Sequence, residues 1–222
     1  MKNNRKLLLL LAALFTSFWG ISQQSNKTQP AVLWTVQDKE VLIKGLERTR
    51  YELLKEINGL SEKQWSFKED SSRWSILEIV EHLVLQNESY RSEMRTALGQ
   101  PELPQFVEKT KGNDSVFIKY ATDTLKADAG FLTPIDRFCN TEKAALAFNK
   151  VQDLLIDMVT NSNKDFRKHF TFRNFVQDNH LSNAEKYNVR DMHQLMLTCI
   201  SHADRHLQQL RKVKAHPIYP AL

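Results

Sequence analysis

Apolar residues recur three or four positions apart in four long stretches of the chain, which is the spacing of one face of an α-helix. One stretch opens with a capping box, Ser75-Ile76-Leu77-Glu78, whose hydroxyl and carboxylate can each satisfy a backbone N–H at a helix start. Gly59 and Pro217 end two other stretches. The pattern predicts helices at 38–58 and 75–98, a third that follows Thr141 as its N-cap, and a fourth from about Val189 to Lys214.

Two long connectors lie between these predicted helices. Residues 100–140 contain several Gly and Pro residues and show weak periodicity, which is typical of a lid or a crossover, with a short helix around 114–127 as an option. Residues 161–187 form a second irregular connector, and no segment has a convincing strand pattern. Four amphipathic helices of about 20 residues predict an all-α fold, a four-helix bundle with long irregular connectors.

The N-terminal 22 residues resemble an export signal. A short basic region precedes the apolar run 7–19, which is too short to span a bilayer comfortably, and cleavage near Ser22 fits the small residues there. We therefore expect a signal peptide at 1–22, a linker at 23–37, a folded domain at 38–220, and a periplasmic or secreted protein. The alternative is an uncleaved membrane anchor.

The composition agrees with a helical fold, and the net charge limits the classes of partner that we expect. Gly and Pro are scarce, at 6 each, which favours helices over a fold with many tight turns. The net charge is +5, and subtracting the three basic residues Lys2, Arg5 and Lys6 leaves +2. Because the positive and negative charges of the rest of the chain are nearly balanced, we have no reason to expect nucleic acid as a partner. We expect a small-molecule substrate of unknown identity, and contact with a membrane only through the export signal.

Two histidines lie on the apolar face of the fourth predicted helix. His202 and His206 are four residues apart, which stacks their imidazoles one turn apart on one side. Neutral imidazoles that face a core need partners, because unpaired buried polar groups are costly. A shared metal ion is one solution, and bonds to carboxylates or waters are the alternative. The apolar stripe comprises Met192, Leu195, Met196, Cys199, His202, Ala203, His206, Leu210 and Val213.

His82 is the third candidate ligand, at the edge of the apolar face of the predicted helix 75–98. Two histidines from one helix and one from another would form a three-point site with an open fourth position for water or substrate, as in catalytic zinc sites. Imidazoles also suit nickel, cobalt, copper and iron. Gln86 and Gln209 each lie about one turn from a ligand and are candidate supporting residues. His193 lies on the opposite side of the fourth helix and is expected at the surface.

The other chemically active residues give weaker signals. Cys139 and Cys199 could pair in an oxidising compartment, and two free thiols are the alternative. Cys199 lies about one turn before His202, and we expect a small core residue there rather than a ligand. No general base can be named. Glu81 and Asp204 are conceivable, and both are expected to be solvated.

Two segments resemble the DinB-like family. The segment 74–83, WSILEIVEHL, is similar to the family motif in which a Trp-Ser helix start precedes a His-Leu pair. The segment 202–220, HADRHLQQLRKVKAHPIYP, is similar to the family's closing helix and tail. The resemblance covers roughly 38–220. It implies a four-helix bundle with a three-histidine metal site, nickel or zinc, whose ligands map onto His82, His202 and His206.

The resemblance also implies an activity class. Members of known activity include transferases that use thiols such as bacillithiol and a mycothiol-dependent isomerase, and many others are described only as metal-dependent hydrolases. We therefore expect a metal-dependent hydrolase or transferase in which the metal lowers the pKa of a bound water or thiol. Such thiols work in the cytoplasm, which conflicts with an exported transferase. The alternatives are a non-catalytic bundle with a structural metal or a bound ligand or partner, and a metal-free bundle with hydrogen-bonded histidines. Bundles of this family also form dimers, so a homodimer is an option.

Overall fold

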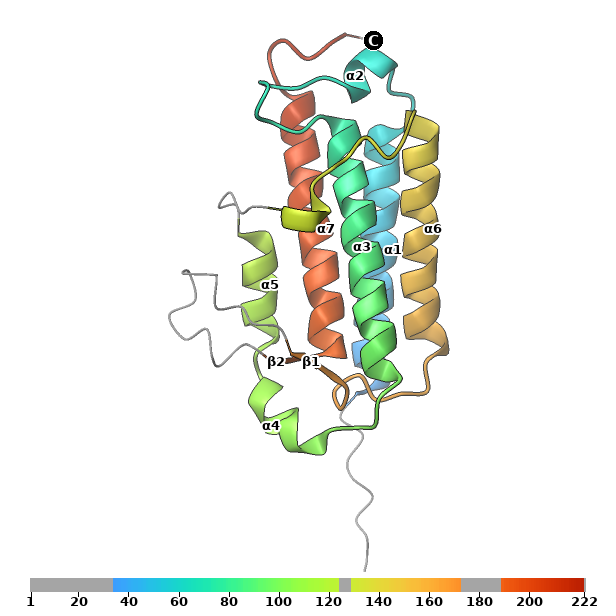
Figure 1. Ribbon diagram of the computed structural model, residues 1–222, viewed down its shortest axis with the longest axis vertical. Coiled ribbons are helices and arrows are strands. Elements are labelled where there is room, and N and C mark those ends of the chain that lie inside the picture. Colours follow the sequence, from blue (N-terminus) through green and yellow to red (C-terminus); the bar gives the residue numbers. More distant parts are fainter. Residues whose placement is uncertain (1–33, 124–128, 173–188, 222) are drawn as a thin grey trace, which may run out of the picture. The chain divides into compact units, whose positions relative to one another are not determined.

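The computed structural model describes residues 34–123, 129–172 and 189–221 (Figure 1). The predicted signal peptide at 1–22 and residues 23–33 of the predicted linker lie outside this part. No helix among the described residues is both long enough and apolar enough to cross a membrane.

Four long helices form the bundle that the sequence pattern predicts. They are α1 (Val36–Ile57), α3 (Ile76–Leu98), α6 (Thr141–Asn161) and α7 (Met192–Lys214). Shorter elements lie in the connectors. They are α2 (Glu62–Trp65), the 3-10 turn η1 (Pro104–Phe106), α4 (Val107–Thr110), α5 (Asp114–Thr122) and the 3-10 turn η2 (Gly130–Leu132).

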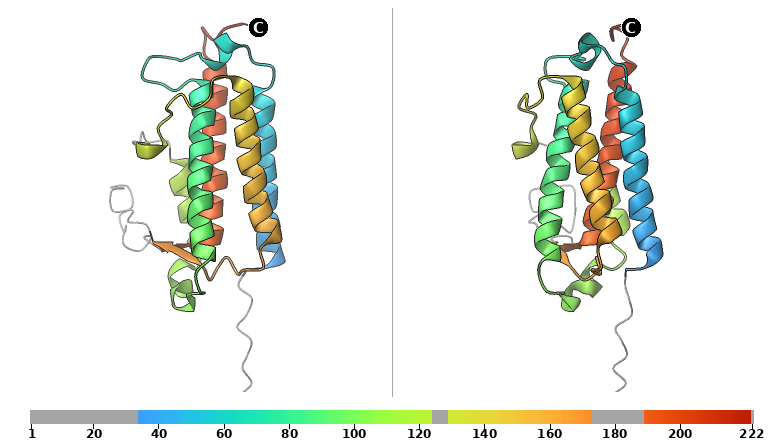
Figure 2. Two further views of the ribbon diagram at one scale, coloured as in Figure 1. Left: turned by 45° about the vertical axis from the view of Figure 1, so that its right-hand side comes forward. Right: turned by 90° about the vertical axis from the view of Figure 1, so that its right-hand side faces the viewer.

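The order of the four helices explains the long connectors. Helices α1 and α3 each pack against both α6 and α7. Helices α1 and α7 run in one direction and α3 and α6 in the other, as the colours in Figures 1 and 2 show. Because α3 and α6 are parallel neighbours, the chain must return along the bundle between them. The connector 99–140 makes this return, and its helix α5 packs against α7. The expected crossover is therefore present.

The helix ends follow local rules, with two corrections to the predicted bounds. The capping box at Ser75 is formed as predicted. Thr141 is not the N-cap of α6, because the Asn140 side chain accepts the N–H of Lys143 at 3.0 Å. The fourth helix begins at Met192 rather than near Val189, because 189–191 form a strand. This strand, β2 (Val189–Asp191), pairs antiparallel with β1 (Phe170–Phe172). The sequence pattern did not predict either strand.

The start of α7 is buried, which corrects the expected surface position of His193. Its side chain is 3% exposed, and Trp34 Nε1 donates to its Nδ1 at 3.2 Å. Arg167 crosses the same region and pairs with Asp114 at 2.8 Å and with Asp38 and Asp191 at 3.3 Å. Helix α5 and Trp34 pack over this side of α7. They therefore bury a face of the helix that the helical wheel alone predicts to be exposed to solvent.

This burial makes His193 acid-sensitive. Desolvation lowers the pKa of His193 from 6.5 to about 4, and the charge of Arg167 also lowers it, while Asp114 and Asp38 raise it. Between these pH values the unfolded chain binds a proton that the native protein does not, so stability is lost as the pH falls from 6.5 toward 4. The contribution is at most about 3 kcal/mol.

The pH dependence can be measured directly. We expect His193→Asn, which keeps an acceptor for Trp34, to flatten the fall in free energy of unfolding between pH 7 and 4.5. Urea titrations at several pH values provide the measurement. Parallel curves for the two proteins would contradict the assignment.

Candidate metal centre

The antiparallel packing of α3 and α7 brings the three candidate histidines together. His82 lies in the second turn of α3, His202 lies near the middle of α7 and His206 lies one turn further along, where the two antiparallel helices pack together. His82 Nε2 and His202 Nε2 are 3.0 Å apart. Each of the three rings offers a nitrogen, and these nitrogens lie within 4.8 Å of one another. The predicted convergence of His82 with the other pair is therefore present.

Hydrogen bonds orient two of these rings. His82 Nδ1 donates to the carbonyl of Leu132 at 2.8 Å, and His206 Nδ1 donates to Gln209 Oε1 at 2.8 Å. Carbonyl oxygens only accept, so each Nδ1 carries the proton and each neutral ring presents the lone pair of Nε2. Gln209 thus has the expected supporting position. Gln86 is buried, but within the described part of the chain it makes no hydrogen bond to His82.

Burial keeps the three imidazoles neutral. Desolvation lowers the pKa of His82, and it lowers the pKa values of His202 and His206 well below 6.5. The positive charge of Arg205 lowers all three pKa values further. Metal ligation requires neutral imidazole, so near neutral pH the rings are in the ligating state.

The donor set fits a divalent transition metal. In the described part of the chain, the cluster consists of three imidazoles and includes no carboxylate or thiolate. Two nitrogens bound to one ion at about 2.1 Å in tetrahedral geometry are about 3.4 Å apart, compared with 3.0 Å between Nε2 of His82 and Nε2 of His202 and at most 4.8 Å within the set. Without an ion, His206 Nε2 accepts from Arg205 and the Nε2 atoms of His82 and His202 share one proton between them. Imidazole donors suit zinc, nickel, copper or iron.

Apolar and backbone groups surround the cluster. The half-buried ring of Trp74 lies 4.7 Å from the His82 ring and 6.2 Å from the His206 ring, centre to centre. Turn η2 lies against α3 and supplies the Leu132 carbonyl (Figure 1). The role of Leu132 has no sequence signal, because every residue carries a backbone carbonyl.

Neither conceivable general base faces the site. Glu81 is 1% exposed, which corrects the expectation that it is solvated, and its carboxylate accepts the backbone N–H groups of Ile135 at 2.8 Å and Arg137 at 3.2 Å. Asp204 is half-buried and accepts from both terminal nitrogens of Arg48 at 2.7 Å. Glu81 therefore holds the segment that carries the Leu132 carbonyl.

We expect Glu81→Gln to weaken metal binding by about 10-fold, the lower end of the range for residues that orient ligands. A glutamine offers one acceptor instead of two, so the segment that orients His82 loses a backbone hydrogen bond. Competition with a chromophoric chelator measures the affinity. The matched control is Glu88→Gln on the same helix, which weakens the two hydrogen bonds between Glu88 and the Arg137 side chain, at 2.7 and 3.3 Å, and leaves the backbone bonds to Glu81 in place. Equal affinities in both variants and the unaltered protein would contradict this role.

Both cysteines are free, so the expected alternative of a disulfide is excluded. Cys139 is exposed and Cys199 is buried. Cys199 Sγ donates to Asn87 Oδ1 at 3.0 Å, and desolvation raises the pKa of the thiol to about 12. Cys199 is therefore a core residue rather than a metal ligand, as expected.

Comparison with known proteins agrees with this geometry. A model of the DinB superfamily matches residues 45–210. The chain belongs to the DinB superfamily. No curated protein matches it. Among solved structures it is similar to YfiT from Bacillus subtilis, with a TM-score of 0.56 and 10% identity over 81% of this chain and 87% of that one. YfiT is described as a probable metal-dependent hydrolase with an unusual four-helix bundle topology. This DinB protein shares the fold, and its three-histidine cluster supports binding of a divalent metal.

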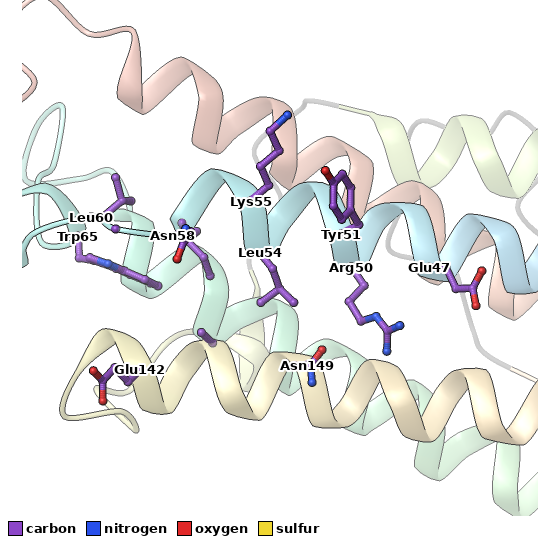
Figure 3. Close-up of a pocket in the computed structure, with 13 residues that line it drawn as sticks. Glu47, Arg50, Tyr51, Leu54, Lys55, Asn58, Leu60, Trp65, Glu142 and Asn149 are labelled. Carbon is purple, nitrogen blue, oxygen red and sulfur yellow. The ribbon is translucent and has the colours of Figure 1, made fainter.

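A separate groove of about 1120 Å³ lies between α1 and α6. Arg50 and Leu54 extend from α1 toward α6, and Asn149 lies on α6 opposite them (Figure 3). None of the three histidines lines this groove. The candidate metal centre therefore lies elsewhere, between α3 and α7.

Proposed function

We propose that this DinB protein is an exported metalloprotein in which His82, His202 and His206 hold one divalent transition ion, nickel or zinc. It acts as a metal-dependent hydrolase or transferase on a small molecule. The convergence of the three histidine nitrogens without a fourth protein donor among the described residues carries the proposal. Three protein ligands and an open position are the arrangement of catalytic sites, and His202 is half-buried rather than fully buried.

Each residue has a distinct part in the proposed chemistry. The bound ion supplies Lewis acidity to a water or substrate group at the open position. Leu132 and Gln209 keep the Nδ1 protons in place and so keep Nε2 of His82 and His206 available. Trp74 covers the cluster and excludes water from that side.

Hydrolysis is the better supported of the two reactions. The structural relative YfiT is described as a probable metal-dependent hydrolase. The predicted signal peptide at 1–22 would deliver the protein to the periplasm or the medium, away from the cytoplasmic thiols that family transferases use. The proposed partners are a small-molecule substrate and, as an option, a second copy of the chain.

Cobalt substitution distinguishes this function from a purely structural metal. Azide added to the cobalt-loaded protein is expected to change the visible spectrum, because an external ligand can enter an open position. Ester, amide and phosphoester panels on metal-loaded and chelated protein then identify the reaction. A spectrum that azide leaves unchanged would support a closed, structural site and contradict the enzyme proposal.

A further inference from the structure

Arg205 places a positive charge directly beside the histidine cluster. Its Nη2 donates to His206 Nε2 at 2.9 Å, and its Nη1 donates to the backbone carbonyl of Asp123 at 2.9 Å. Its Nε is buried and has no hydrogen-bond partner in the described part of the chain. Of the three donor nitrogens, only Nη1 is engaged with a group outside the proposed metal site.

Several other buried or half-buried arginines in the described part of the chain are paired with carboxylates. Arg190 pairs with Glu93 at 3.2 Å, and Arg211 pairs with Glu52 at 2.9 Å and with Glu56 at 2.8 Å. Arg205 instead donates to a carbonyl and an imidazole. Burial lowers its pKa, and the charge of the Asp123 carboxylate raises it, although these two groups form no ion pair. An anion that binds next to this guanidinium should stabilise it more than it would stabilise the paired arginines. The free-energy cost of burying a charge is offset mainly by a paired opposite charge.

Metal binding would add further positive charge next to Arg205. His206 Nε2 is one of the nitrogens assigned to the metal, and its lone pair cannot serve both the ion and Arg205. A divalent ion on three neutral imidazoles, together with Arg205, concentrates three positive charges in a cluster without an acidic ligand. At short range and partial burial, such charges repel strongly unless an anion lies with them.

We propose that Arg205 and the open metal position together bind an oxyanionic group of the substrate, a carboxylate or a phosphate. This inference rests on the proposed function and names its substrate class. The planar guanidinium offers paired N–H donors that match two oxygens of such a group. Arg205 is thus a substrate-binding residue, and neutral substrates without an oxyanion bind poorly.

Phosphate binding to the cobalt-loaded full chain tests the inference. We expect Arg205→Gln to weaken inorganic phosphate binding, followed by the visible spectrum and by calorimetry, by about 10- to 100-fold, as for loss of charged hydrogen bonds. Arg205→Lys keeps the charge and should recover part of the affinity. Arg211→Gln, on the same helix but paired with Glu52 and Glu56, should bind phosphate normally.

Metal affinity provides a readout that needs no substrate. Arg205→Gln should bind zinc at least as tightly as the unaltered protein, because it removes a neighbouring positive charge. Equal phosphate affinity in the unaltered protein and Arg205→Gln, or no phosphate binding by the metal-loaded protein, would overturn the oxyanion site while leaving the metal proposal intact. Failure of the unaltered protein to bind metal would instead overturn the proposed function itself.

Discussion

Replacing His202 and His206 together by alanine is expected to remove the metal from this DinB protein. Only His82 would remain of the three converging imidazoles. The affinity should fall by more than about 100-fold, the upper end of the loss caused by residues that merely orient ligands. Mass spectrometry of purified, dialysed protein measures the metal content, and circular dichroism checks that the helices persist.

The chain provides a matched control on the same helix. His193 is as deeply buried as His206, at 3% and 2% exposure, and lies near the opposite end of α7. His193→Asn should therefore retain full metal content. Full occupancy in the double variant, or loss of metal in the control, would show that the ion is bound somewhere else.

Replacing Arg167 by methionine should have the largest effect on stability. Arg167 is the cation shared by Asp38, Asp114 and Asp191, and the Asp191 side chain is only 2% exposed. Its removal leaves carboxylates in a desolvated cluster without their partner. Breaking a buried ion pair in this way costs about 3 to 5 kcal/mol of unfolding free energy. Urea denaturation at pH 7 measures the loss.

A surface pair provides the comparison for Arg167. Lys44 lies 3.0 Å from Glu40, and both side chains are largely exposed, so Lys44→Met should change stability by less than about 1 kcal/mol. Metal affinity should stay unchanged in both variants, because Arg167 lies at the end of the bundle opposite the histidines. A loss below about 1 kcal/mol for Arg167→Met would indicate that the cluster contributes no net stability.

Helical periodicity predicted the bundle because four long helices each bury one face, and burial of that face dominates their stability. The strands β1 and β2 could not be predicted, because they are short and are held by a contact between distant parts of the chain. Each has three residues, and their pairing joins Phe170 to Asp191 across a long connector. Such a contact leaves no periodic signal in either segment. The observed N-cap of α6 is Asn140, one residue before the predicted Thr141, because the two residues are adjacent and both residue types cap helices.

The sequence predicted the parts of the candidate site that lie on one helix, but not the contacts between helices. The spacing of His202 and His206 indicated one shared face, whereas the place of His82 depended on how α3 and α7 pack. The helical wheel put His193 opposite His202 correctly but could not show that Trp34 covers it. Leu132 acts through its backbone, which gives it no signature in the sequence.

Anomalous diffraction from crystals of the native protein, collected at the absorption edges of nickel and zinc, tests the central claim most directly. A single peak is expected between His82, His202 and His206, about 2.0 to 2.1 Å from one nitrogen of each ring, with a non-protein ligand at the remaining position. A peak elsewhere, or a well-ordered cluster without any peak in metal-supplemented crystals, would contradict it.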